Sequence, residues 1–140
     1  MNFSDNGLIV QLTAEDQHRV QEICQPVMLE AGETLCPSSL NADPAVYFLT
    51  GACVAMVAEG PEPASLALGL VGSEGAIGLF AALQNTPDHL RFVVQTPGAA
   101  WRADSSALTR LLQQQPAILW SLARYLGQLA DDVAGMAASM

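Results

Sequence analysis

Three glycines, Gly72, Gly75 and Gly78, fall within seven residues at the end of an apolar run that favours β-strands. A short helix is expected directly afterwards, over residues 78–84. Glycine permits tight turns that other residues disfavour, and the N–H groups at the start of a helix attract anions. The stretch therefore predicts either an anion-binding turn or a plain connection between a strand and a packing helix. The residues leave both interpretations open.

The length of 140 residues suits a single domain, residues 1–140, with a sizeable core. Hydrophobic residues make up 51% of the chain and charged residues 14%, which predicts a globular protein and excludes a disordered one. No apolar run is long enough to span a bilayer, and the first residues lack the pattern of a signal peptide. We therefore expect a cytoplasmic protein.

The numbers and positions of the cysteines and arginines exclude further classes of function. Cys24, Cys36 and Cys53 are an odd number without a Cys-x-x-Cys pair, so no disulfide framework, metal or other cofactor is expected. The net charge is −9, and the five basic residues are all arginines, scattered along the sequence. Because no basic cluster is available to neutralise phosphates, this chain alone is not expected to bind nucleic acid.

Residues 1–26 predict a tail followed by a helix. The first twelve residues show little pattern, and we expect them to pack loosely. Thr13 is a suitable N-cap, and Glu15 and Asp16 are favourable in a first helical turn. Pro26 is expected to end this helix.

Residues 27–103 alternate short apolar segments with turn residues, which is typical of an antiparallel roll or barrel. The expected strands are residues 27–29, 33–36, 46–50, 53–58, 65–70, 91–95 and 99–102.

Residues 105–140 predict two helices, the first capped by Ser105 and the second with Pro116 in its first turn. Apolar residues recur in the second helix at intervals of three and four, as in a coiled-coil seam: Leu119, Leu122, Leu126, Leu129, Val133 and Met136. This seam predicts a homodimer through the C-terminal helix. The alternative is that the same stripe packs on the β core of its own chain.

This order of elements resembles the sensor domain of bacterial Crp/Fnr-type transcription regulators. The local matches are Gly-Glu-Thr-Leu at 32–35, Val-Tyr-Phe-Leu at 46–49 followed by Gly51, the glycine-rich stretch, and residues 94–102. The resemblance covers roughly residues 27–140, without the DNA-binding winged helix of those regulators. It implies an α+β, mainly β, fold: an antiparallel β-roll of the double-stranded β-helix or jelly-roll type, cyclic-nucleotide-binding-domain-like, with an N-terminal helix and a long C-terminal dimerisation helix.

The resemblance also implies a function and a set of site residues. The chain is expected to be an effector-sensing regulatory domain in transcription regulation, with a small-molecule effector and no enzymatic activity. The expected ligand-binding residues are Gly72, Glu74, Gly75, Gly78, Leu79, Phe80, His89 and Arg91. For Glu74, a hydrogen bond from a ligand hydroxyl and simple exposure to solvent are both open.

One departure from the family pattern bears on the ligand. Members that bind cyclic nucleotides open the short helix with Gly-Glu, and the carboxylate holds the ribose hydroxyl. Here Gly78 is followed by Leu79, whose side chain accepts no hydrogen bond. The family's Arg-Ser/Thr-Ala run, which holds the cyclic phosphate, corresponds to residues 89–93, where His89 and Arg91 stand. The resemblance thus implies a small anion or a nucleotide-like effector other than cyclic AMP.

Two other functions compete with this one. The apolar Leu79 and Phe80 also suit a dimerising interaction module with a vestigial pocket. A cupin-like metal enzyme would share the β-roll, but it needs several histidines with a carboxylate, and the chain contains only His18 and His89. No pattern of nucleophile and base is recognisable, so catalysis is not expected.

Overall fold

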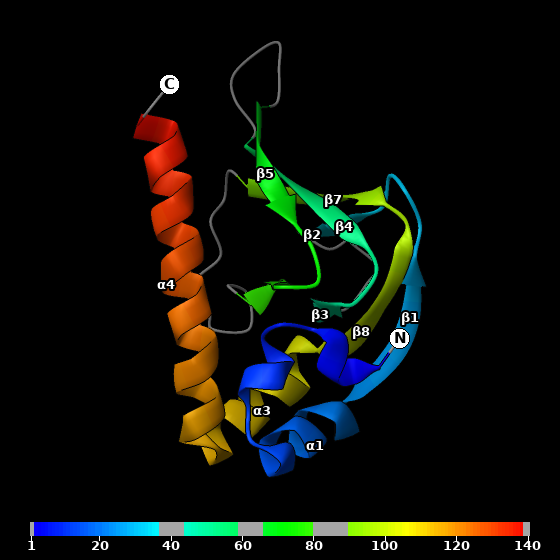
Figure 1. Cartoon of the computed structure of the whole chain (residues 1–140), viewed down its shortest axis with the longest axis vertical. Helices are drawn as coiled ribbons and strands as arrows, with labels where there is room; N and C mark the ends of the chain where they lie inside the picture. Colours follow the sequence, from blue (N-terminus) through cyan, green and yellow to red (C-terminus); the bar gives the residue numbers. More distant parts are fainter. Residues whose placement is uncertain (1, 37–43, 59–65, 80–89, 139–140) are drawn as a thin grey trace.

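The computed structural model describes residues 2–36, 44–58, 66–79 and 90–138, and side chains within them except those of 36, 66–68, 90 and 129–138. Two antiparallel four-stranded sheets form a β-roll (Figure 1). One sheet has the order β1 (Cys24–Leu29), β8 (Gly98–Asp104), β3 (Ala45–Leu49) and β6 (Ala76–Ile77). The other has the order β2 (Thr34–Cys36), β7 (Leu90–Thr96), β4 (Cys53–Ala58) and β5 (Leu66–Val71). The predicted antiparallel roll is confirmed.

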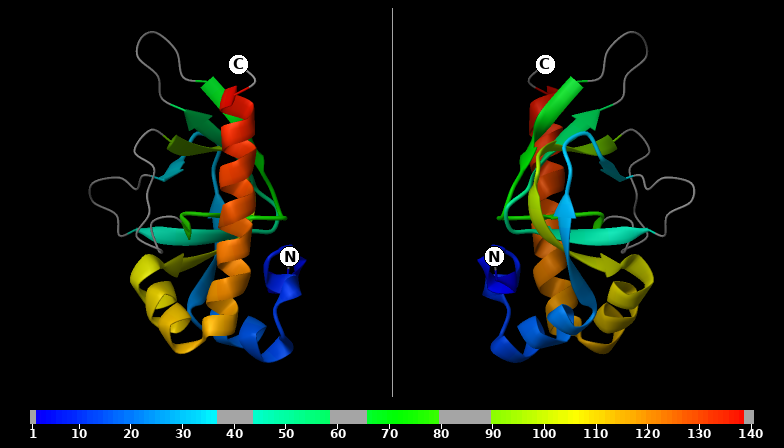
Figure 2. Two further views of the ribbon diagram at one scale, coloured as in Figure 1. Left: turned by 90° about the vertical axis from the view of Figure 1, so that its left-hand side faces the viewer. Right: turned by 90° about the vertical axis from the view of Figure 1, so that its right-hand side faces the viewer.

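Helices gather at one end and along one side of the roll. Helices α1 (Ala14–Glu22) and α3 (Ser105–Gln114) lie at one end, and α4 (Pro116–Ala138) runs along the length of the molecule (Figures 1 and 2). Pro116 begins α4, as predicted, whereas Ser105 is the first residue of α3 and not its N-cap, which is Asp104. Leu79 is helical, and the rest of the short helix expected at 78–84 lies outside the described residues. Within the described residues, no helix combines the length and the apolar character needed to cross a membrane.

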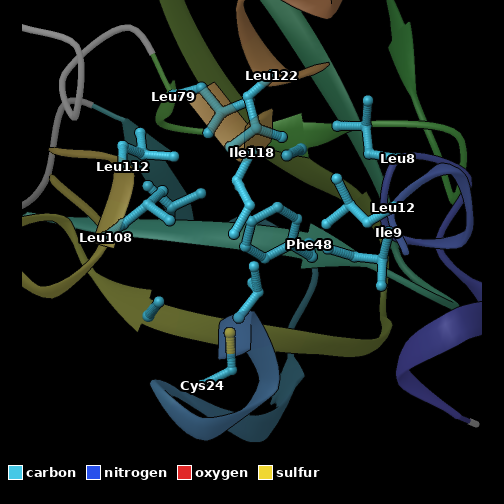
Figure 3. Packing of buried hydrophobic residues seen from close by; sticks show 14 of the residues in the cluster. Leu8, Ile9, Leu12, Cys24, Phe48, Leu79, Leu108, Leu112, Ile118 and Leu122 are labelled. Carbon is cyan, nitrogen blue, oxygen red and sulfur yellow. The ribbon is translucent and has the colours of Figure 1, made fainter. Parts of the chain in front are cut away.

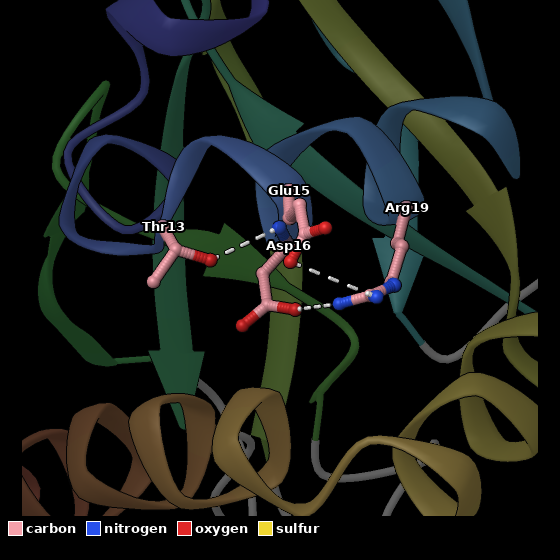
Figure 4. A network of polar contacts seen from close by, with 4 residues as sticks. All are labelled: Thr13, Glu15, Asp16 and Arg19. Carbon is pink, nitrogen blue, oxygen red and sulfur yellow. Dashed lines mark hydrogen bonds and ion pairs between the residues drawn. The ribbon is translucent and has the colours of Figure 1, made fainter.

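The start of α1 follows the sequence prediction. Thr13 Oγ1 accepts a hydrogen bond of 3.1 Å from the backbone N–H of Asp16, which satisfies one of the free donors of the first turn (Figure 4). Arg19 then pairs with Asp16 at 2.6 Å and lies 3.9 Å from Glu15.

The predicted end of this helix is wrong. The helix stops at Glu22, and Pro26 lies within β1, which is paired only with β8 in its sheet. An edge strand tolerates proline because its missing N–H can face away from the sheet.

The expectation that residues 1–12 pack loosely is also wrong. This segment forms two 3-10 turns, η1 (Phe3–Asp5) and η2 (Ile9–Gln11), and four of its apolar side chains are buried: Phe3, Leu8, Ile9 and Leu12. Phe3 packs edge-on against Phe48 and Trp101, with ring centroids 6.1 and 5.3 Å away. Two short turns have too few residues to show helical periodicity, so the sequence pattern did not reveal this packing.

Buried side chains form two clusters on opposite faces of β3. The inner cluster fills the space between the sheets and includes Leu49, Val54, Ile77 and Phe92. The outer cluster lies between β3 and the helices, and includes Ile9, Phe48, Leu79, Leu108 and Leu122 (Figure 3). Strand β3 is thus covered on both faces, which explains its unbroken apolar sequence.

Candidate functional site

The candidate site is centred on the turn of residues 72–75, which joins β5 of one sheet to β6 of the other. The N–H of Gly75 donates to the carbonyl of Gly72 at 3.1 Å and closes the turn. The exposed Glu74 folds back, and its Oε1 accepts a hydrogen bond of 2.9 Å from the N–H of Gly72. The Glu74 carboxylate therefore engages the turn itself as well as solvent.

Gly78 and Leu79 follow the turn and β6 in the sequence, and both are buried. Gly78 has a φ of +92°, and a Cβ at this position would collide with the carbonyl oxygen of Ala45. Only glycine fits this conformation and this space. Leu79 is 1% exposed and lies beside Ile118 and Leu122 of α4 (Figure 3).

Gly75 is in direct contact with α4 as well. A Cβ on Gly75 would strike the hydroxyl of Tyr125 and lie 2.8 Å from Cγ1 of Val71. The Tyr125 hydroxyl is 3.4 Å from both the backbone nitrogen and the carbonyl oxygen of Ala76. The absence of a side chain at residue 75 thus lets α4 approach the turn.

The N-terminal segment lies against the turn through Asn6 and Gly7. Asn6 is fully buried, and its Nδ2 donates to the carbonyls of Leu49 at 2.7 Å and Gly75 at 2.8 Å. The N–H of Gly7 donates to the carbonyl of Ser73 at 2.6 Å.

Sequence reasoning missed both Asn6 and Tyr125. For Tyr125, one signal was available: a polar aromatic residue interrupts the apolar side of an amphipathic helix. For Asn6, the partners are 43 and 69 residues away along the chain, and no local pattern reports them.

The structure does not bring Arg91 to this turn. Arg91 on β7 is opposite Val57 of β4, whereas the turn leaves β5 after Val71, which is opposite Val54. Three residues along β4 correspond to about 10 Å. Arg91 also alternates along β7 with the buried Phe92, and so lies on the other face of that strand. Phe80 and His89 lie outside the described residues.

The predicted seam of α4 is partly used within the chain. Leu122 and Leu126 are buried in the outer cluster, and the half-buried Leu119 packs against it. The side chains of Leu129, Val133 and Met136 are not among those described, so the assignment of the six residues to an interface stays a prediction. The opposite side of α4 carries Trp120, which is 71% exposed and forms a surface cavity of about 450 Å³ with Ala123 and Arg124.

Titratable groups offer no sign of catalysis or metal binding in the part of the chain that is described. Burial raises the pKa of the Cys24 thiol to about 12, so this cysteine is neutral and inert near pH 7. Among the described residues, no three side chains of histidine, cysteine, aspartate or glutamate gather to hold a metal ion.

Known structures share this fold, although no family model and no curated protein match the sequence significantly. A cyclic-nucleotide-binding domain from Methylobacillus flagellatus KT has a TM-score of 0.76 and 15% identity, over 99% of this chain and 84% of that one. The sensor domain of the transcriptional regulator DNR from Pseudomonas aeruginosa has a TM-score of 0.65 and 19% identity, over 89% and 83% of the two chains.

A third similar structure is longer than this chain. The catabolite activator protein of Thermus thermophilus has a TM-score of 0.73 and 15% identity over 92% of this chain, which spans only 60% of that protein. None of the three names describes an enzyme. The chain therefore has the fold of the cyclic-nucleotide-binding and sensor domains found in Crp/Fnr-type transcription regulators.

Proposed function

We propose that this chain is an effector-sensing regulatory domain, acting in the cytoplasm in transcription regulation, with an output carried by α4. The fold supports a regulatory sensor, because structures of that fold include regulators and their sensor domains. The observation that carries the proposal is that two successive parts of the candidate site touch the same helix. Gly75 lies against Tyr125, and Leu79 lies against Ile118 and Leu122.

A ligand at the turn can act on α4 only if it binds two arrangements of the chain with different affinity. Because Gly75 and Leu79 contact α4, a ligand that moves either residue would act on this helix directly. Any change in the conformation of residues 72–79 alters the surface on which α4 packs.

The effector that suits this site is a small anion or a nucleotide-like molecule other than cyclic AMP. Leu79 supplies no acceptor for a ribose hydroxyl, and Glu74 already accepts a hydrogen bond from Gly72. The proposed ligand-binding residues remain Gly72, Glu74, Gly75, Gly78, Leu79, Phe80, His89 and Arg91. The lack of a charged partner for a buried polar group lowers affinity by a few kcal/mol.

Because Leu122 and Leu126 of the predicted seam pack in the chain's own core, we further propose that α4 pairs with a second copy of the chain through its exposed side. Trp120, Ala123 and Gly127 recur at intervals of three and four on that side. Among the described residues, a Cβ on Gly127 would meet nothing within 4 Å, so packing within that part of the chain does not require a glycine there. Small residues let two helices approach closely, which gives this glycine a role in an interface with a partner.

A dimerising interaction module with a filled pocket is the second candidate, and Leu79 favours it. A residue that is 1% exposed in the core is not accessible to a ligand unless α4 moves. The two functions differ in whether any effector stabilises the chain.

Titration calorimetry with cyclic AMP, cyclic GMP and a panel of small anions tests the sensor. We expect no cyclic AMP binding at micromolar concentrations and binding of at least one other compound. A ligand that uses both the turn and Arg91 must span the roughly 10 Å between them. For such a ligand Arg91→Ala should abolish binding, while Arg110→Ala, at an exposed position of α3, serves as the matched control. Micromolar binding of cyclic AMP would show that Leu79 does not exclude it, and unchanged affinity in Arg91→Ala would place the pocket elsewhere.

A further inference from the structure

The N-terminal segment and α4 hold the same peptide group from opposite sides. The carbonyl of Gly75 accepts a hydrogen bond from Asn6 Nδ2 at 2.8 Å, and the N–H of Ala76 lies 3.4 Å from the Tyr125 hydroxyl. These two groups belong to one planar peptide unit, in which the carbonyl and the N–H point in opposite directions. A rotation of this plane therefore changes both contacts together.

Asn6 has no spare hydrogen-bonding capacity with which to absorb such a rotation. Its Nδ2 donates to Leu49 and Gly75, and its Oδ1 accepts from the N–H groups of Leu8 at 3.0 Å and Ile9 at 3.2 Å. All four bonds are made in a fully buried position. Losing the Gly75 carbonyl would leave a buried N–H without an acceptor, which is unfavourable enough to displace the segment.

Tyr125 has little room to adapt on the other side. Its hydroxyl occupies the space that a side chain on Gly75 would need, and Tyr125 belongs to a helix whose neighbouring Leu122 and Leu126 are buried in the outer cluster. The hydroxyl contacts at 3.4 Å are long for hydrogen bonds, so packing against Gly75 supplies part of the restraint.

We propose that the Gly75–Ala76 peptide group is a coupling element that links the N-terminal segment to α4. A rotation of this peptide group weakens or strengthens the contacts of residues 6–9 and those of the middle of α4 at the same time. Asn6 and Tyr125 act as positioning residues, because they hold the backbone of the turn from either side. The regulatory meaning of this coupling rests on the proposed sensor function, whereas the coupling itself does not require an effector.

Amide hydrogen exchange on the full chain without ligand tests this coupling. Tyr125→Phe removes one hydroxyl and should accelerate exchange at Leu8 and Ile9, whose N–H groups donate to Asn6 Oδ1, by about threefold or more. Asn6→Asp keeps the acceptor for Leu8 and Ile9 but removes the donor to Gly75, and should accelerate exchange in α4 around Tyr125. Tyr47→Phe, which removes the chain's other tyrosine hydroxyl, is the matched control and should change neither region.

The proposal is overturned if Tyr125→Phe changes exchange only at Ala76 and in α4, or if Tyr47→Phe has the same effect on Leu8 and Ile9. Should Asn6→Asp fail to fold, the Tyr125→Phe result decides alone. Because no ligand is present, this result is independent of whether an effector exists. A chain that binds an effector but shows no coupling contradicts only this inference.

Discussion

Glycines in this chain serve different physical purposes at different positions. Gly78 is constrained twice, by its φ of +92° and by the carbonyl of Ala45. Gly32 has the same φ but open space around it. Gly75 is constrained by its neighbours, above all Tyr125, whereas no described residue constrains Gly127.

Comparing the stabilities of Gly32→Ala and Gly78→Ala distinguishes the cost of backbone strain from the cost of a steric collision. Gly32→Ala should lower the free energy of unfolding by about 1 kcal/mol, which is the cost of a left-handed conformation for a residue with a Cβ. Gly78→Ala should cost clearly more, about 3 kcal/mol, because the Ala45 carbonyl must also move. Urea denaturation measures both values, and equal losses would show that the collision is relieved at no cost.

Cys24 should resist thiol reagents in the folded protein. Burial raises the pKa of its thiol from 9.0 to about 12, so little thiolate forms even at pH 9. The half-buried Cys53 is the internal comparison. Labelling followed by mass spectrometry at pH 8 should modify Cys53 first and Cys24 only after unfolding. Equal labelling rates for the two would mean that the segment around Cys24 opens readily.

The same raised pKa makes stability depend on pH in the alkaline range. Above pH 9 the thiol of Cys24 ionises in the unfolded chain but stays protonated in the folded one, which favours unfolding. The free energy of unfolding should therefore fall between pH 9 and 12, by up to about 1.4 kcal/mol per pH unit from this group. Cys24→Ala should lack this component when denaturation is measured at pH 7 and pH 10. An identical loss in both proteins would assign the pH dependence to other groups.

The hydrogen bonds of Asn6 could not be predicted from the sequence. An asparagine before a glycine suggests a turn, and nothing nearby indicates that its amide reaches two carbonyls on distant strands. The cap at Thr13 was predictable, by contrast, because its partner Asp16 is three residues away.

The α4 helix illustrates the limit of periodicity for a whole element. Intervals of three and four predicted one apolar side correctly, since Leu122 and Leu126 are buried together. Periodicity does not say whether the partner is another chain or the chain's own core, and these two side chains pack in the core. Most strand positions were predictable from turn residues, but β1 begins three residues earlier than expected and the two-residue β6 was not predicted.

Substitutions on the two sides of α4 should have opposite effects. Gly127→Glu improves helix propensity by about 0.5 kcal/mol and meets open space, so the folded chain should tolerate it. It should nevertheless dissociate a dimer that uses the exposed side of α4. Leu122→Glu places a charge in the core and should instead unfold the chain.

Light scattering and thermal denaturation distinguish these effects. Gln113→Glu, an exposed change of similar charge on α3, should alter neither the mass nor the melting temperature. A wild-type chain that is already monomeric at micromolar concentration, or a dimeric Gly127→Glu, contradicts the proposed interface.

The net charge of the chain sets its behaviour toward nucleic acids. A net charge of −9 with five scattered arginines repels the phosphate backbone. A mobility-shift assay with a random-sequence duplex should show no binding by this chain at physiological salt. Tight binding that weakens as salt is raised would contradict this prediction.

The architecture as a whole was the most predictable property of the molecule. Turn residues at regular intervals predicted the roll, and the long apolar stripe predicted the final helix. The candidate site was predictable only as a turn, because its neighbours Asn6 and Tyr125 come from the two ends of the chain and meet only after folding.

Trp120 allows the most direct test of a sensor that signals through α4. In Trp101→Phe, which keeps an aromatic ring beside Phe3, Trp120 is the only tryptophan and reports on the exposed side of α4. Acrylamide quenching of Trp120 is measured with cyclic AMP, cyclic GMP, phosphate and pyrophosphate, together with the melting temperature. We predict that at least one compound other than cyclic AMP raises the melting temperature and also changes the quenching of Trp120. A compound that stabilises the chain while leaving Trp120 quenching unchanged would contradict the central claim that the effector acts through α4.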